Sequence, residues 1–245
     1  MDTGLKGKTV LITGASRNMG LRAPILFARE GANLAICTSA KMKELNAVAE
    51  EARGLGVTVV AEKCDITDAA MVARFVKKTR DELGGVDVAI NLAGYRADRD
   101  FLEESFDVWS RTIDVNLNGP YHICRNVIPL MMERRWGRII NISGLGPLRG
   151  VGVAKGMVKL GIIGFTRGLA REFADYNITA NCIGPGSIDR VHDAHESVKS
   201  LPAAQPIKRW GTPDEAISLM LYLASEQSSF ITGQCYLVNG GAYFQ

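Results

Sequence analysis

Short apolar runs alternate along the chain with longer stretches of helical periodicity. Val10, Leu11 and Ile12 form the first run, which predicts a buried strand, and a helical pattern follows over 21–30. Later runs predict strands over 34–37, 57–61, 86–90, 138–142, 178–183 and 234–238. Helices are predicted over 42–53, 69–83, 106–134, 155–176 and 213–224. This alternation is typical of an α/β fold with a doubly wound parallel sheet, which binds ligands at the carboxyl ends of its strands.

A glycine turn separates the first strand from the first helix. Gly14 permits the turn, Gly20 lets the helix approach the strand, and Asn18, where a middle glycine is expected, can adopt a left-handed backbone. The remaining candidate binding residues of this turn are Ser16, Arg17 and Met19. Backbone N–H groups and the positive end of the helix dipole favour an anion here, so we predict a phosphate-binding site.

Composition and charge narrow the class of protein. The 245 residues are 47% apolar and 22% charged, without a linker-like segment, so we expect one domain over 1–245. A net charge of +3 is too small to indicate nucleic acid or a membrane surface as partner. The first strand leaves no room for a signal peptide and no apolar run reaches membrane length, which predicts a cytoplasmic protein.

The cysteines and histidines show no metal-binding pattern. Four of the five cysteines lie in or beside apolar segments, which predicts buried thiols in a reducing compartment. His192 and His195 have no third donor at metal-ligand spacing, so we expect no metal.

Several motifs resemble those of the short-chain dehydrogenase/reductase family, in its order and spacing and over nearly the whole chain. They are Thr13-Gly14-x5-Gly20, Asp65-Ile66, Asn91-x-Ala93-Gly94, Asn116, Pro185-Gly186-x-Ile188 and the ending Thr232-Gly233-Gln234…Val238-Asn239-Gly240-Gly241. The resemblance implies a Rossmann-like fold, a nicotinamide cofactor and a small carbonyl or alcohol substrate. It also implies a homo-oligomer, commonly a tetramer, formed through the helices over 106–134 and 155–176 and the apolar tail Ala242-Tyr243-Phe244. Periodicity alone does not separate such an interface from ordinary core.

Three of these motifs are candidate contacts with the cofactor. Asp65 can accept a hydrogen bond from an adenine amino group, or it can instead cap the following helix. Asn91, Ala93 and Gly94 would let the backbone approach the cofactor ribose, unless they form only a tight loop. By resemblance, the segment Pro185-Gly186-x-Ile188 covers the nicotinamide.

The end of the second strand bears on the choice of cofactor. An acidic residue there would bind the ribose hydroxyls and repel a 2′-phosphate, but the chain has Thr38-Ser39-Ala40-Lys41, with Glu44 the first carboxylate. With Arg17 in the glycine turn, these residues suit a phosphate dianion. We therefore expect NADP(H) in preference to NAD(H); the alternative is that Lys41 is merely solvated.

The catalytic positions depart from the family pattern. By resemblance, Lys159 would hold the nicotinamide ribose and Asn116 a proton-relay water. Lys155 stands four residues before Lys159, where the family has its proton-donating tyrosine, and Gly144 stands where it has its serine. Ser143 would replace that serine only if the loop shifts by one residue. Another register pairs Val151 with Lys155 and also lacks the tyrosine.

Two ammonium groups one helical turn apart disfavour each other's charge. Lys155 could then act as a general acid or base, or as an imine-forming amine. Alternatively it points to solvent or binds a cofactor phosphate, and the site turns over weakly or not at all. Tyr95 is a second candidate donor, although an aromatic residue that packs on a neighbour is the simpler interpretation.

Basic residues gather on the segments at the carboxyl side of the sheet: Arg96, Arg149, Lys155 and Arg190. With the histidines of a predicted lid over 187–209, they favour an anionic substrate such as a carboxylate or a coenzyme A thioester, unless they are simply solvated. The leading hypothesis is an NADP(H)-dependent oxidoreductase. The alternatives are a non-redox enzyme on the same fold (a lyase, hydrolase or isomerase) and a cofactor-binding protein without turnover.

Overall fold

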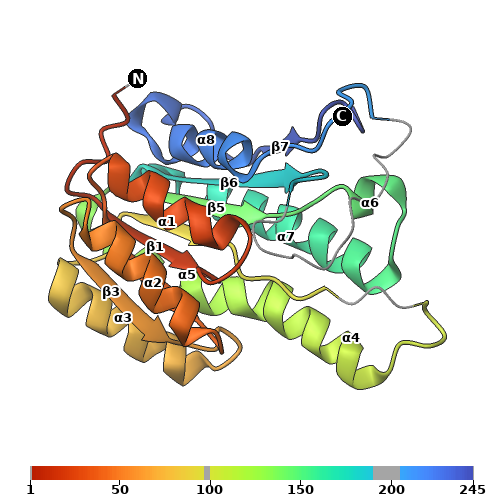
Figure 1. Ribbon diagram of the computed structural model, residues 1–245, viewed down its shortest axis with the longest axis horizontal. Coiled ribbons are helices and arrows are strands. Elements are labelled where there is room, and N and C mark those ends of the chain that lie inside the picture. Colours follow the sequence, from red (N-terminus) through yellow and green to blue (C-terminus); the bar gives the residue numbers. More distant parts are fainter. Residues whose placement is uncertain (1, 97–99, 190–204, 245) are drawn as a thin grey trace.

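A seven-stranded parallel sheet forms the centre of the molecule in a computed structural model that describes residues 2–96, 100–189 and 205–244 (Figure 1). Its strands are β1 (Thr9–Thr13), β2 (Asn33–Thr38), β3 (Val59–Lys63), β4 (Val88–Asn91), β5 (Gly137–Ile142), β6 (Ile178–Pro185) and β7 (Cys235–Val238). They lie in the order β3-β2-β1-β4-β5-β6-β7, and each neighbouring pair is parallel. The strand order reverses between β1 and β4, which is where doubly wound sheets bind nucleotides. The predicted fold class is confirmed.

Helices cover both faces of the sheet. One face carries α1 (Met19–Arg29), α2 (Met42–Arg53) and α8 (Pro213–Ala224), and the other carries α3 (Ala69–Leu83), α5 (Gly119–Arg134) and α7 (Val153–Glu172). Side chains of β1 alternate between the two cores: Val10 and Ile12 enter the first and Leu11 the second. Both faces are therefore buried, which explains the continuous apolar runs.

Most elements differ from the expected bounds by one to four residues at an end, and three differ in a way that has a clear physical reason. Strand β3 lies two residues later than predicted, because its polar residues Glu62 and Lys63 still pair with β2 at the edge of the sheet. The predicted helix over 106–134 is α4 (Phe106–Ile113) and α5, joined by a π-helical segment, Asp114–Asn118. The short helix α6 (Gly146–Arg149) is too brief to show periodicity and was not predicted.

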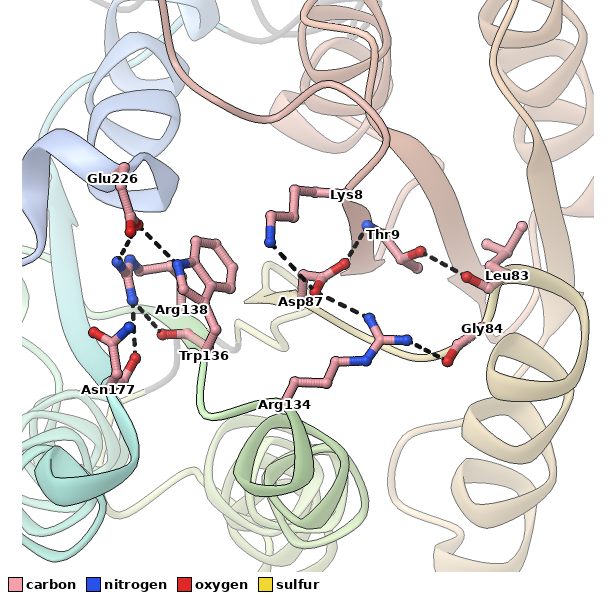
Figure 2. Close-up of polar contacts among 11 residues, drawn as sticks. Lys8, Thr9, Leu83, Gly84, Asp87, Arg134, Trp136, Arg138, Asn177 and Glu226 are labelled. Atoms are coloured by element: carbon pink, nitrogen blue, oxygen red, sulfur yellow. Dashed lines mark hydrogen bonds and ion pairs between the residues drawn. The ribbon is translucent and has the colours of Figure 1, made fainter.

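Two groups of polar contacts lie at the amino ends of the strands, away from the glycine turn (Figure 2). The Arg138 side chain is fully buried and its guanidinium donates to Glu226 Oε2 (2.9 Å) and to the Asn177 carbonyl (3.1 Å). Asp87, directly before β4, accepts from the Thr9 amide (2.8 Å) and from Arg134 (3.0 Å). Burial lowers the pKa of Arg138, and the Glu226 carboxylate opposes this. Because these groups satisfy one another at the end of the strands away from the glycine turn, we assign them a structural role.

The cysteines lie where the sequence predicts. Cys37, Cys64, Cys124 and Cys182 are buried free thiols, and Cys235 is half-buried. Among the described residues, no helix is long and apolar enough to cross a membrane.

Candidate active site

The glycine turn between β1 and α1 has the close contacts that its residues predict. Gly14 and Asn18 both have positive φ, +70° and +50°. A Cβ on Gly14 would lie 2.7 Å from the Ala93 Cα, and a Cβ on Gly20 would lie 2.1 Å from the Gly14 carbonyl oxygen. Helix α1 begins here with no side-chain cap and no acidic residue in its first turn. The turn thus presents an uncapped helix N-terminus, which favours an anion.

A cleft of about 1210 Å³ opens over this turn at the carboxyl edge of the sheet. Its volume and its glycine cradle suit an extended ligand the size of a dinucleotide. It brings together most of the predicted site residues, namely Gly14, Ser16, Arg17, Asn18, Met19, Gly20, Thr38, Ser39, Asp65, Ile66, Ala93, Gly94, Asn116, Lys155 and Lys159. Asn91, Ser143, Pro185, Gly186 and Ile188 are not among its lining residues.

Asn91 and Ser143 instead hold neighbouring elements together. The buried Asn91 amide donates to Asn141 Oδ1 on β5 (2.8 Å). The buried Ser143 hydroxyl donates to the Lys159 carbonyl of α7 (2.9 Å). These side-chain bonds do not test the predicted approach of the backbone at Asn91 to the ribose, which stays a prediction. They give no support to the predicted contact of Ser143 with the substrate.

The segment after β6 packs against the chain that follows β7. The Gly186 amide donates to the Val238 carbonyl (2.9 Å), and a Cβ on Gly186 would lie 2.7 Å from the Asn239 Cα. Ile188 forms an isolated bridge with Gly211. The predicted cover of the nicotinamide by this segment stays a prediction. Arg190, His192 and His195, with most of the predicted lid, lie outside the described residues.

Asp65 does not cap the helix after β3, so that alternative interpretation is wrong. Asp68 caps α3 instead, because its carboxylate accepts from the Ala70 and Met71 amides. Asp65 Oδ1 accepts from the Thr67 amide (3.0 Å) and hydroxyl (2.8 Å). Burial raises the pKa of Asp65, but these bonds and the nearby Arg111 outweigh it, so the net shift is downward. Asp65 therefore keeps a charged carboxylate at the rim of the cleft.

The end of β2 presents hydroxyl groups. The Thr38 and Ser16 hydroxyls lie 2.7 Å apart and are buried, and Ser39 and Lys41 line the cleft beside them. Arg17 reaches the opposite rim, where its guanidinium donates to the Gly94 carbonyl (2.6 Å). Among the described residues, the candidates to bind a 2′-phosphate therefore remain Thr38, Ser39 and Lys41. Arg17 would contact such a phosphate only if its side chain turned away from the Gly94 carbonyl.

Asn116 sits in the π-helical segment that joins α4 to α5. Its amide nitrogen donates to the carbonyls of Tyr95 and Thr112, both at 2.9 Å, while its buried Oδ1 has no hydrogen-bond partner. A buried acceptor at a cleft wall needs a donor such as water or a ligand hydroxyl. This orphaned oxygen fits the relay-water role implied for Asn116, and π-helical segments often occur at functional sites.

Lys155 and Lys159 line the cleft from one face of α7. The Lys159 ammonium donates to the Ile142 carbonyl at the end of β5 (2.9 Å). Burial lowers its pKa to about 8; the Cys182 side chain opposes this shift and the Lys155 charge adds to it. A Cβ on Gly146 or on Gly152 would touch the aliphatic stem of Lys155, at 3.6 and 3.5 Å. Burial is thus the main cause of the lowered Lys159 pKa, and the expected repulsion from Lys155 adds to it.

Position 144, where the family has its serine, has free space around it. A Cβ added to Gly144 would meet no heavy atom within 4 Å. Position 144 therefore has room for a side chain that this sequence does not provide, although Gly144 is not among the residues that line the cleft.

Of the predicted basic cluster, Arg96 and Lys155 line the cleft, whereas Arg149 is exposed on α6 and is not a lining residue. Tyr95 also lines the cleft and packs against the core under α5. The sequence did not single out Arg22 and Arg111, because each occupies an ordinary helix position with no local motif. Among the described residues, no group of three or more His, Cys, Asp or Glu side chains could hold a metal ion.

The lowered pKa of Lys159 predicts a pH dependence of cofactor binding. The family resemblance implies that Lys159 binds the nicotinamide ribose. Its charged form would make the stronger hydrogen bonds to the ribose hydroxyls, so NADPH affinity should fall as pH rises through about 8. Removing the neighbouring charge in Lys155→Met should raise the Lys159 pKa and move this midpoint to higher pH. Titrations by fluorescence from pH 6 to about 10 measure it. An NADPH affinity that does not change across this pH range would contradict the contact of Lys159 with the ribose.

The fold and the cleft together define a class: a doubly wound α/β protein with a cleft the size of a dinucleotide over its glycine turn, lined by Lys155 and Lys159. The family model described as Enoyl-(Acyl carrier protein) reductase matches residues 14–243. The 3-oxoacyl-[acyl-carrier-protein] reductase of Chlamydia muridarum is 37% identical over 98% of this chain and 99% of its own length. That of Aquifex aeolicus is 34% identical over 99% of this chain and all of its own.

Solved structures agree with these sequence relatives. A 3-oxoacyl-[acyl-carrier protein] reductase from Brucella melitensis superposes with a TM-score of 0.89 at 32% identity, over 100% of this chain and 94% of that one. A putative short-chain alcohol dehydrogenase from Sinorhizobium meliloti gives 0.89 at 27% identity, over 97% of each chain. The chain belongs to the short-chain dehydrogenase/reductase family. It is an NAD(P)-dependent oxidoreductase with a nicotinamide cofactor.

Proposed function

We propose that this protein is an NADP(H)-dependent oxidoreductase for a small anionic carbonyl or alcohol, with Lys155 in the place of the family tyrosine. The observation that carries the proposal is the pair Lys155 and Lys159 on one wall of the cleft that also contains the glycine turn. The relatives' names describe reduction of a 3-oxoacyl group, which supports a ketone substrate. The missing carboxylate at the end of β2 supports a 2′-phosphate on the cofactor.

Each of these cleft residues has a separate role in the proposed reaction. When bound, the nicotinamide supplies or accepts a hydride. Lys159 would hold the ribose hydroxyls, and Lys155 would donate a hydrogen bond and a proton to the substrate oxygen. The orphaned Asn116 oxygen would hold the water that reprotonates Lys155. Arg96 and Lys155 would attract the anionic part of the substrate.

A matched pair of ketones tests this proposal. Acetoacetyl-coenzyme A and ethyl acetoacetate carry the same ketone, but only the first is anionic. NADPH oxidation should be at least about tenfold faster with the first, and Lys155→Met should lower its kcat/KM about 100-fold. The residue-matched control is Lys77→Met, because Lys77 is exposed on α3 and does not line the cleft.

Other outcomes favour the alternatives. NADPH bound without oxidation across the ketones would favour a binding protein without turnover. Trapping of substrate on Lys155 by borohydride would favour an imine mechanism, because only a covalent imine is reduced to a stable adduct. Preference for NADH would overturn the NADP(H) assignment.

We also propose that the protein is a homo-oligomer, as the family resemblance implies, with a tetramer as the expected form. Exposed apolar side chains on α5 and α7 support this: Tyr121 is 51% and Leu160 53% exposed. Light scattering should give a mass about four times that of the 26.6 kDa chain, and a monomer mass would contradict the proposal.

A further inference from the structure

Arg111 on α4 reaches over the cleft to the segment after β3. Its guanidinium donates to Asp65 Oδ2 (3.3 Å) and to the Thr67 hydroxyl (3.4 Å). Both side chains of the ion pair line the cleft and remain partly exposed, Arg111 at 43% and Asp65 at 32%. The pair thus lies at the surface of the cleft. Its donor–acceptor distances are too long for a strong ion pair.

Apolar side chains complete this end of the cleft. Ile66 and Val115 are almost fully buried and also line it. A Cβ on Gly119 would lie 2.4 Å from the Ile66 Cδ1, so Ile66 is packed firmly against the start of α5. The result is an apolar wall beside a carboxylate and a planar cation.

These three features suit a flat aromatic base with an exocyclic amine. The amine would donate to Asp65, one face of the ring would pack on Ile66, and the guanidinium would lie against the other face. Arginine stacks on aromatic faces because its planar cation is attracted by π electrons and is weakly hydrated. Adenine is the part of the cofactor with this chemistry.

We propose that Arg111 is a cofactor-binding residue that stacks on the adenine ring. The inference rests on the proposed function, because it requires a dinucleotide in the cleft. The competing explanation is that Arg111 acts only through Asp65, by holding the Asp65–Thr67 turn. A third explanation is that Arg111 binds the 2′-phosphate.

Titrations of NADPH and NADH separate these explanations. Arg111→Ala should weaken both cofactors equally, by about tenfold, because both carry adenine. The same loss should persist in an Asp65→Ala background, where there is no carboxylate for Arg111 to hold. The charge-matched control is Arg125→Ala, since Arg125 is exposed on α5 and does not line the cleft.

Several results would overturn the inference. Loss of NADPH affinity alone would identify a phosphate contact. No further loss in the Asp65→Ala background would show that Arg111 only positions Asp65, and unchanged affinity for both cofactors would exclude any binding role. If the unmodified protein binds neither cofactor, the proposed function fails instead, so the two failures are distinguishable.

Discussion

Changing Gly144 to serine and Lys155 to tyrosine together is expected to raise NADPH-dependent reduction of ethyl acetoacetate by about 100-fold. The double variant restores both hydroxyls of the family pattern on a scaffold that keeps Asn116 and Lys159. A serine side chain has room at position 144, where a Cβ would meet nothing within 4 Å. A tyrosine at 155 would lie one helical turn before Lys159, whose cationic form would lower the phenol pKa. Steady-state oxidation of NADPH measures the gain.

Single variants serve as controls for this gain. Gly144→Ser alone should change little, because the proton donor would still be an amine, and Lys155→Tyr alone should give only part of the gain. The double variant should also lose its preference for acetoacetyl-coenzyme A, since the ammonium group is gone. A folded, NADPH-binding double variant without any gain would contradict the assigned register of α7 and β5.

Replacing Gly20 with alanine is expected to weaken NADPH binding more than about 100-fold. The new Cβ would lie 2.1 Å from the Gly14 carbonyl oxygen, a backbone atom that cannot move without opening the turn. The turn would then lose the geometry that presents the N-terminus of α1 to the phosphates. Overpacking of this kind also costs roughly 1–3 kcal/mol of stability, which denaturant unfolding measures alongside the titration.

Gly144→Ala is the matched control for that variant. It adds the same methyl group to a glycine at the same edge of the sheet, but in open space. Its NADPH affinity and its free energy of unfolding should stay close to those of the unmodified protein. If Gly20→Ala binds NADPH as well as this control does, the glycine turn is not the phosphate site.

The sequence predicts elements best where local chemistry defines their ends. Helices α2, α3 and α8 have the predicted bounds. Asp68 caps α3, and Gly84 ends it in the left-handed conformation. Thr212 and Glu215 form a capping box at the start of α8. Such signals depend only on neighbouring residues, so they are visible without the tertiary structure.

Side-chain direction at the carboxyl edge could not be predicted in the same way. Consecutive residues of a strand point to opposite faces, so the pattern at a strand end does not by itself say whether the side chains of Asn91, at the end of β4, and Ser143, directly after β5, face the cleft. Their partners, Asn141 and the Lys159 carbonyl, come from distant segments. The bond from Arg111 to Asp65 likewise joins residues 46 positions apart, and no local pattern indicates it.

The most direct test of the account is a crystal structure of the protein with NADP bound. We expect the pyrophosphate at the turn from Gly14 to Gly20, the nicotinamide ribose on Lys159, and the Lys155 ammonium group beside the nicotinamide. A tyrosine hydroxyl at the nicotinamide, with Lys155 turned to solvent, would contradict the proposed role of the amine. A cleft that admits no dinucleotide would contradict the whole account.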